Sequence, residues 1–236
     1  MPVTAKQILD RARRIVQDET SVRWPLAELT QWLNDALREV VLLKPSASSK
    51  NVVLDLQAGT YQPIPDEYLS LLRVVRNVEQ LAPGGVRVGG RAVRLCPRDV
   101  LDAQHPDWHM PEVVPFKAEV KHYIYDEADP KTFYVYPGND GTGQVEAIMS
   151  KEPDEIVASA DPEELDSYSA PIDLPAIYAN AVLDYVLYRA YSKDAQYAGN
   201  AERAGIHYTQ FQNSLGMKAQ SEANNSPNMT RGVRPG

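Results

Sequence analysis

Residues 23–44, with the sequence RWPLAELTQWLNDALREVVLLK, constrain the fold more than any other stretch of this chain. Pro25 suits the start of a helix, where its missing N–H loses no intrahelical partner, and Pro45 stops the helix at the other end. Charged and amide side chains occupy one face, so the helix is predicted to pack on its other face only. That face carries apolar residues at intervals of three and four: Leu26, Leu29, Trp32, Leu33, Ala36, Leu37, Val40 and Val41.

A first helix is predicted over residues 5–18. Thr4 and Gln7 form a capping-box pattern at its start. The expected inner face comprises Ile8, Leu9, Ala12, Ile15 and Val16, and the polar side carries Arg11, Arg13 and Arg14. Arginines on a polar helix face are most often solvated, and a partner contact is the alternative.

Two further helices are predicted near the end of the chain, from Leu174-Pro175 to about residue 193 and over residues 199–220. A connector rich in Pro, Asp, Glu and Ser at 153–173 leads into them, and its carboxylates favour a solvated helix start over a catalytic pair. The two helices are rich in tyrosine, which packs its ring while keeping its hydroxyl hydrated. These tyrosines indicate core packing, with an intersubunit surface as the alternative.

The middle of the chain favours strands. Alternating apolar residues predict strands at 51–57, 73–81, 120–127, 132–138 and 143–153, the last three forming a small sheet. A short helical turn is expected at 63–71 and a short helix within 97–109. Two Gly-Gly pairs in the stretch PGGVRVGGRAVRL suit turns between short strands.

Composition restricts the function. The chain has 236 residues, a formal charge of −8 and one cysteine, Cys96. A single cysteine excludes an internal disulfide and fits a reducing cytoplasm. The acidic balance argues against tight, sequence-reading DNA binding. We expect no membrane span and no export by a signal peptide, because neither apolar pattern occurs.

Catalytic chemistry has little support, and we expect no cofactor and no metal. Cys96 is interpreted as a small packed residue rather than a nucleophile. His105 and His109 with Asp102 or Asp107 have a spacing that a metal tolerates, but Pro106 interrupts any helix between them. A small hydrolase or metal enzyme therefore remains only an alternative.

The order of these segments resembles that of the head-to-tail adaptor proteins of tailed bacteriophages, the connector subunits beneath the portal. The motifs ILDRARRIVQDE (8–19) and RWPLAELTQWLNDALREV (23–40) carry the resemblance at the start of the chain. GTYQPIPDEYLSLLRVV (59–75) and the tyrosine-rich run at 176–216, which ends in FQNSLG, carry it further along. Pro25 is a departure, since many relatives have a Ser or Thr cap there.

The resemblance implies an α+β fold with a helical bundle core, a β-rich insertion and an extended C-terminal tail. The expected segments are 1–45 and 154–221 for the core helices with their connector, 46–153 for the insertion and 222–236 for the tail. It also implies a structural virion protein, made in the host cytoplasm and placed in the neck. There it would form a dodecameric ring that binds the portal above and the tail tube or nozzle below, with genomic DNA passing through without sequence-specific binding.

The tail has too little apolar content to fold by itself. We expect it to dock on a neighbouring subunit or on the portal. Met229 and Val233 would enter shallow pockets, and Arg231 and Arg234 would pair with partner carboxylates.

Two other functions remain open. A DNA-binding regulator would use Arg11, Arg13 and Arg14 in a helix-turn-helix, although the net charge and the long second helix oppose it. Another tail-completion protein, or a capsid-decorating protein, of the same kind of virus is the nearer structural alternative.

Overall fold

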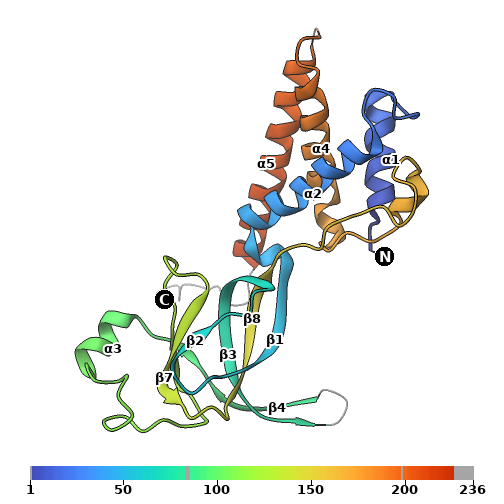
Figure 1. The fold of residues 1–236 in the computed structure, drawn as a ribbon. Helices are drawn as coiled ribbons and strands as arrows, with labels where there is room; N and C mark the ends of the chain where they lie inside the picture. The colour runs from blue at the N-terminus through green and yellow to red at the C-terminus, as the bar shows by residue number, and fades with distance from the viewer. Residues whose placement is uncertain (1, 83–85, 198, 226–236) are drawn as a thin grey trace, which may run out of the picture. The chain divides into compact units, whose positions relative to one another are not determined.

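The computed structural model describes residues 2–82, 86–197 and 199–225 (Figure 1). The chain divides into two compact units, Met1–Ala47 with Pro153–Gly236 and, separately, Ser48–Glu152. We call the first the helical unit and the second the β-strand unit, after the elements that dominate each. The presence of both helices and sheets confirms the α+β class.

Among its described residues, the helical unit contains four α-helices: α1 (Ala5–Val16), α2 (Leu26–Leu43), α4 (Ala179–Lys193) and α5 (Asn200–Asn225). Short 3-10 helices, η2 (Leu165–Tyr168) and η3 (Ala176–Tyr178), precede α4. α4 contacts each of the other three α-helices, and α2 crosses it in Figure 1. The helix predictions are therefore confirmed, and α5 runs to Asn225, past the residue at which the tail was expected to begin.

Local sequence accounts for the starts of the first two helices. The Gln7 backbone N–H donates to the Thr4 hydroxyl at 3.3 Å, and the Gln7 side chain accepts from the Thr4 N–H at 3.1 Å. This confirms the capping box. Pro25 is the N-cap of α2 rather than its first residue, and no side chain caps that end. All eight residues of the predicted apolar face of α2 are buried.

The tyrosines of α4 and α5 pack against one another. The ring centres of Tyr185 and Phe211 lie 5.2 Å apart, and those of Tyr188 and Tyr208 lie 4.8 Å apart. Tyr191 is buried, whereas Tyr197, in the turn between the two helices, is half exposed. Core packing therefore explains most of these rings.

A buried amide ties the connector at 153–173 to α2. The Asn34 side chain donates to the carbonyl of Ile156 and accepts from its N–H, both at 2.9 Å. Both backbone groups of one buried residue are thereby satisfied by one side chain. Further along the connector, Ile172 donates its N–H to the Val3 carbonyl at 2.9 Å, which places this segment beside the start of α1.

The described part of the β-strand unit, 48–82 and 86–152, contains two four-stranded sheets. One has the order β1 (Ser49–Asp55), β8 (Gln144–Lys151), β3 (Tyr68–Ala82) and β4 (Val86–Ala92). The other has the order β2 (Gly59–Pro63), β7 (Thr132–Asn139), β6 (His122–Ile124) and β5 (Arg94–Leu95). A short helix, α3 (Arg98–Gln104), confirms the prediction for 97–109.

The expectation that β6, β7 and β8 share one sheet is wrong, because β8 pairs with β1 and β3. Asn139 accounts for the change of sheet. Its buried side chain donates to the carbonyls of Lys117 and Ala118 at 3.0 and 2.9 Å. It also accepts from the N–H groups of Gly141 and Gly143 at 2.8 and 3.2 Å. The loop after β7 is therefore fixed in a shape that directs the chain into the other sheet.

The helical turn expected at 63–71 is reduced to one hydrogen-bonded turn, in which the Tyr68 N–H donates to the Pro65 carbonyl at 3.0 Å, and residues 68–71 belong to β3 instead. The register between β3 and β8 shifts three times, and each shift leaves one residue of β3 without a partner. A bulge inserts one residue into the two-residue repeat of a strand. Tyr68, Leu71 and Val74 are consequently buried at intervals of three, a spacing that mimics a helix.

The second Gly-Gly pair lies inside β4 rather than in a turn. A Cβ atom at Gly89 would overlap the guanidinium of Arg76, and one at Gly90 would lie 3.0 Å from Cγ of Glu79. These glycines make room for side chains of the neighbouring strand. The first pair, Gly84-Gly85, lies outside the described residues.

Candidate interaction surface

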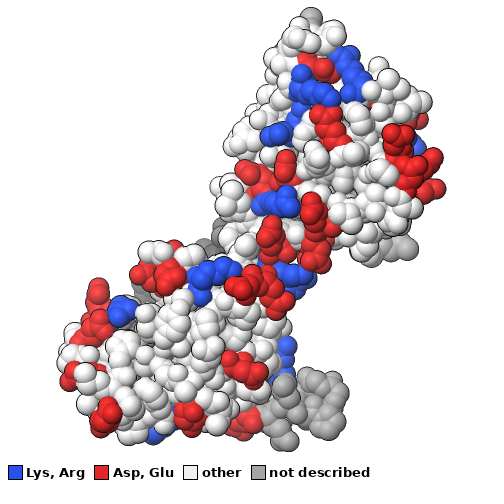
Figure 2. All heavy atoms as spheres, in the orientation of Figure 1, with Lys and Arg blue, Asp and Glu red and all other residues white. Residues whose placement is uncertain are grey.

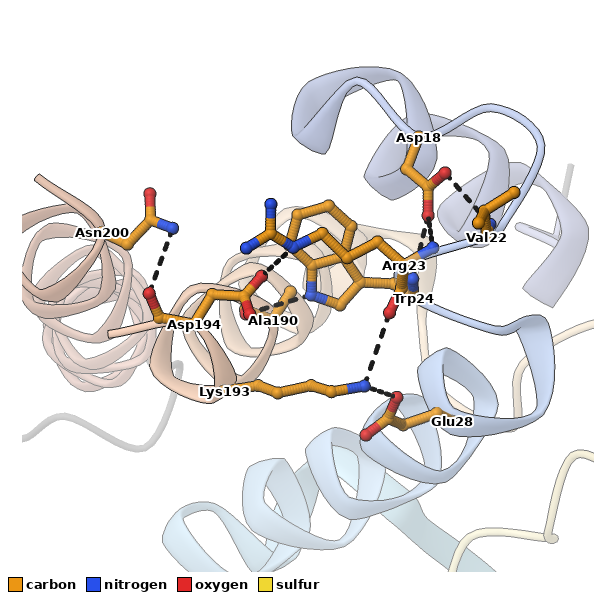
Figure 3. Close-up of polar contacts among 9 residues, drawn as sticks. All are labelled: Asp18, Val22, Arg23, Trp24, Glu28, Ala190, Lys193, Asp194 and Asn200. Carbon is orange, nitrogen blue, oxygen red and sulfur yellow. Dashed lines mark hydrogen bonds and ion pairs between the residues drawn. The ribbon is translucent and has the colours of Figure 1, made fainter. Parts of the chain in front are cut away.

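Asp18 organises the loop between α1 and α2. Its carboxylate accepts the backbone N–H groups of Val22, Arg23 and Trp24 at 3.1, 2.8 and 2.9 Å (Figure 3). Burial opposes ionisation of Asp18, but the three N–H donors and the charge of Arg13 outweigh it and lower the pKa of the carboxyl. The ionised carboxylate therefore holds the loop in one conformation.

The same loop is attached to the C-terminal end of α4. Trp24 is buried, and its Nε1 donates to the Ala190 carbonyl at 3.1 Å. Arg23 pairs with Asp194 at 2.6 Å, and its guanidinium carbon lies 4.2 Å from the ring centre of Tyr197. The planar guanidinium of Arg23 thus forms an ion pair and stacks on an aromatic ring at the same time.

Two more contacts complete this corner of the helical unit. Lys193 donates to the Arg23 carbonyl at 3.4 Å and pairs with Glu28 of α2 (Figure 3). Asn200, at the start of α5, donates to the Asp194 carbonyl at 3.3 Å. The corner thus joins the C-terminal ends of α1 and α4 to the starts of α2 and α5.

A groove opens between α1 and α5, with α4 as its floor. Its larger part has a volume of about 470 Å³ and a smaller part about 250 Å³. The two parts share Asn180, Ser214 and Met217, so they form one continuous depression. Its apolar lining is Ile15, Ile177, Ala181, Leu183, Leu187 and Met217.

Two pairs of polar side chains in the groove contact each other. Arg11 donates to the Asn180 side-chain oxygen at 3.2 Å, and His207 Nδ1 lies 2.9 Å from the Asp184 carboxylate. The His207 ring also stacks on Tyr191 at 5.7 Å. With these groups occupied, the groove offers apolar contact and shape rather than a nucleophile or a general base. This composition makes the groove a candidate surface for binding another protein segment.

Three apolar side chains at the groove are well exposed. Ile15 is 44% exposed, and Ile177 and Met217 are each 65% exposed. The prediction that Ile15 belongs to the inner face of α1 is therefore wrong. An apolar stripe on a helix predicts that its residues are packed, but it does not show whether they pack in the core of the same chain or against a partner.

The family model described as SU10 adaptor protein matches residues 3–232. The chain belongs to the SU10 adaptor protein family. This confirms the resemblance to phage head-to-tail adaptors and identifies the chain as a phage adaptor structural protein. No match was found among curated proteins.

The adaptor's His105, His109 and Asp102 serve the packing around Trp108. Asp102 accepts from Trp108 Nε1 at 2.8 Å, and His109 Nδ1 lies 2.7 Å from the Thr60 hydroxyl. Burial and the charge of neighbouring Arg98 lower the pKa of His109. Over residues 2–82, 86–197 and 199–225, no group of three or more His, Cys, Asp or Glu side chains is placed to hold a metal ion.

The arginines of α1 in the adaptor are largely engaged within the chain. Arg14 pairs with Asp10 at 2.9 Å, Arg13 donates to the Ser21 hydroxyl at 3.5 Å, and Arg11 bonds Asn180 in the groove. Cys96 is partly buried and packs beside the Trp108 cluster.

The predicted tail-docking residues of the adaptor, Met229, Arg231, Val233 and Arg234, lie outside the described residues. Among the helices that are described, none is long and apolar enough to span a membrane.

Proposed function

We propose that this adaptor forms a dodecameric ring below the portal, joins the capsid to the tail tube or nozzle, and lines part of the DNA channel. The observation that carries the proposal is the family match over residues 3–232. In this arrangement segments 1–45 and 154–221 supply the core of each subunit and 46–153 the insertion. The protein acts in the virion neck, after synthesis in the host cytoplasm, without a cofactor.

The net negative charge of the protein supports a channel through which DNA passes without binding tightly. The net charge is −8, and Figure 2 shows Lys and Arg interspersed with Asp and Glu over the face drawn. Counterion release from a polyanion requires clustered cations, which this face does not offer. We expect duplex binding to be weak, salt-sensitive and independent of sequence. Nanomolar, sequence-specific binding at physiological salt would support the regulator alternative instead.

Assembly is the direct test of the ring. Purified protein, alone and mixed with portal, should give rings in negative-stain images and a fast-sedimenting species in velocity runs. A protein that stays monomeric at every concentration, and that neither binds portal nor is found in the virion neck, contradicts the proposal.

Docking of the tail is the second element of the proposal. Residues 226–236 contain Met229 and Val233 for shallow pockets, with Arg231 and Arg234 for partner carboxylates. A chain truncated after Asn225 keeps all of α5 and should fold normally, but it should fail to attach tails to filled heads in a complementation assay. The matched control is Arg231→Lys with Arg234→Lys, which retains the charges. Normal attachment by the truncated chain would refute a docking role.

A further inference from the structure

α4 lies between two surfaces of the helical unit. Asn180 and Leu187 line the groove from α4, whereas Tyr185 of the same helix is close enough to α2 to be influenced by the charges of Glu39 and Asp35. At about 100° per residue, Tyr185 points about 150° away from the groove side of α4. The groove and α2 therefore occupy nearly opposite sides of α4.

The outer side of α2 is a stripe that changes from polar to apolar. Gln31, Asp35, Arg38 and Leu42 follow at intervals of four, three and four residues, which places them on one line along the helix. Leu42 ends the stripe and is 73% exposed. The next residue, Leu43, is 53% exposed, so the end of this otherwise polar ridge is a localised apolar contact point.

The groove is mixed along its length, with Ile15, Leu183 and Leu187 beside the polar groups of its larger part. The smaller part carries the two most exposed apolar side chains of the lining, Ile177 and Met217, and we call it the apolar end, although Lys218 also lines it. Both apolar side chains there are exposed to the same extent. The apolar end thus has room for one further aliphatic side chain.

The apolar ends of the two surfaces lie at the same end of the helical unit. Lys44, two residues after Leu42, has its Nζ 5.7 Å from the ring centre of Tyr178, and Lys218, next to Met217, has its Nζ 4.3 Å from the same ring. Because both lysines lie near the Tyr178 ring, Leu42 and Met217 lie at about the same height along the helical unit. Copies placed side by side in the same orientation would bring Leu42 of one to the level of Met217 in the next.

We propose that the α2 stripe of one copy packs into the α1–α4–α5 groove of the next, with Leu42 seated between Ile177 and Met217. The occupant is a second copy because one chain carries both halves of the match, on opposite sides of one helix. Such a head-to-tail contact repeats from copy to copy and closes into a ring when the rotation allows. This inference rests on the proposed ring and assigns its contact surface.

Cysteine crosslinking tests the contact. In a Cys96→Ser background, the double variant Leu42→Cys with Met217→Cys should form a ladder of disulfide-linked copies on oxidation. An equal mixture of the two single variants should give a dimer containing one of each, which separates a link between chains from a link within one chain. The control pair is Val22→Cys with Met217→Cys, because Val22 is 81% exposed but lies in the α1–α2 loop, and it should not crosslink.

The outcomes separate this inference from the proposed function. If the variants assemble into rings or necks but form no Leu42–Met217 link, the proposed contact surface is wrong. The proposed ring would be unaffected by that result. Absence of any ring, in solution and in virions, would overturn both.

A second variant measures assembly directly. Leu42→Asp should abolish the ring while leaving the helical circular dichroism and the melting temperature of the subunit unchanged, because the side chain touches little of its own chain. Unimpaired rings from Leu42→Asp would contradict the proposal.

Discussion

At the scale of single residues, buried side chains with specific contacts decide the local structure. Trp32 is 7% exposed in the core of the helical unit. The helical spacing of its neighbours predicts this burial from the sequence alone. The assignment of Asn34 to the polar, solvent-facing side of the second helix is wrong, since Asn34 is 6% exposed and bonds a residue of the connector far along the chain. A local pattern does not contain such a long-range partner.

Trp32→Ala should lower the free energy of unfolding by about 3–5 kcal/mol, because it leaves a large cavity. Thermal or chemical denaturation of the monomeric subunit measures the change. Gln31→Ala, at the neighbouring exposed position, is the control and should change little. An unaltered melting temperature for Trp32→Ala would show that the indole is not part of the core.

Asn34→Asp should destabilise the subunit by about 1–3 kcal/mol at neutral pH, because the carboxylate can accept from the Ile156 N–H but cannot donate to its carbonyl. Asn34→Ala loses both bonds and should cost at least as much. Denaturation curves of the two variants measure both costs, and a fully stable Asn34→Asp would mean that water replaces the lost donor.

At the scale of elements, periodicity predicts the helices well and the strands less well. Only the start of β3, residues 68–71, was mistaken for part of a helical turn, because the bulge at Leu69 spaces the buried Tyr68 and Leu71 by three. Sheet membership depends on long-range pairing, which a local pattern does not contain. The groove was missed for a related reason, since Ile15 and Met217 have the spacing of core residues but lie at a surface.

Glu146 joins the strands of the first sheet. Its carboxylate accepts from Asn51 on β1 at 2.7 Å and from Arg76 on β3 at 2.6 Å, and it pairs with Arg87 on β4 at 3.4 Å. The Asn51 and Arg76 hydrogen bonds, and then the arginine charges, outweigh burial and lower the pKa of Glu146 in the folded state. Its contribution to stability is therefore fully present above the unfolded pKa of about 4.3.

As the pH falls below that value and through the lower, folded pKa, this contribution is lost. The wild-type free energy of unfolding should fall more steeply with decreasing pH than that of Glu146→Gln, which has no carboxyl to protonate. Melting temperatures measured from pH 6 down to acid test this, and parallel profiles for the two proteins would contradict it.

At the scale of the whole molecule, each unit has its own apolar core. The buried cluster that contains Trp32 and Phe211 draws its members from the helical unit, and the cluster that contains Phe133 and Val145 draws its members from the β-strand unit. The chain enters and leaves the β-strand unit at Ser48 and Glu152. Next to these points, Ser49 pairs with Ser150 across antiparallel strands, about 5 Å apart at Cα.

Removal of residues 48–152, with Ala47 joined to Pro153 by a short Gly-Ser linker, should leave the helical unit folded. Residues 48–152 should also fold when produced separately, since each core is contained within its unit. Circular dichroism and cooperative thermal unfolding measure both. An excision of equal length from Tyr68 to Ile172 crosses both units and should fail to fold, and loss of helicity in the first variant would contradict the prediction.

The pairing of Ser49 with Ser150 also determines how the chain transmits a mechanical load. Both backbone connections enter the β-strand unit through neighbouring strands, β1 and β8, at the same end of their ladder. β8 is held on its other side along most of its length by β3, from Lys151 to Gln144. A pull along these strands loads many hydrogen bonds in parallel rather than one after another, so the backbone junction resists tension better than a single linker would.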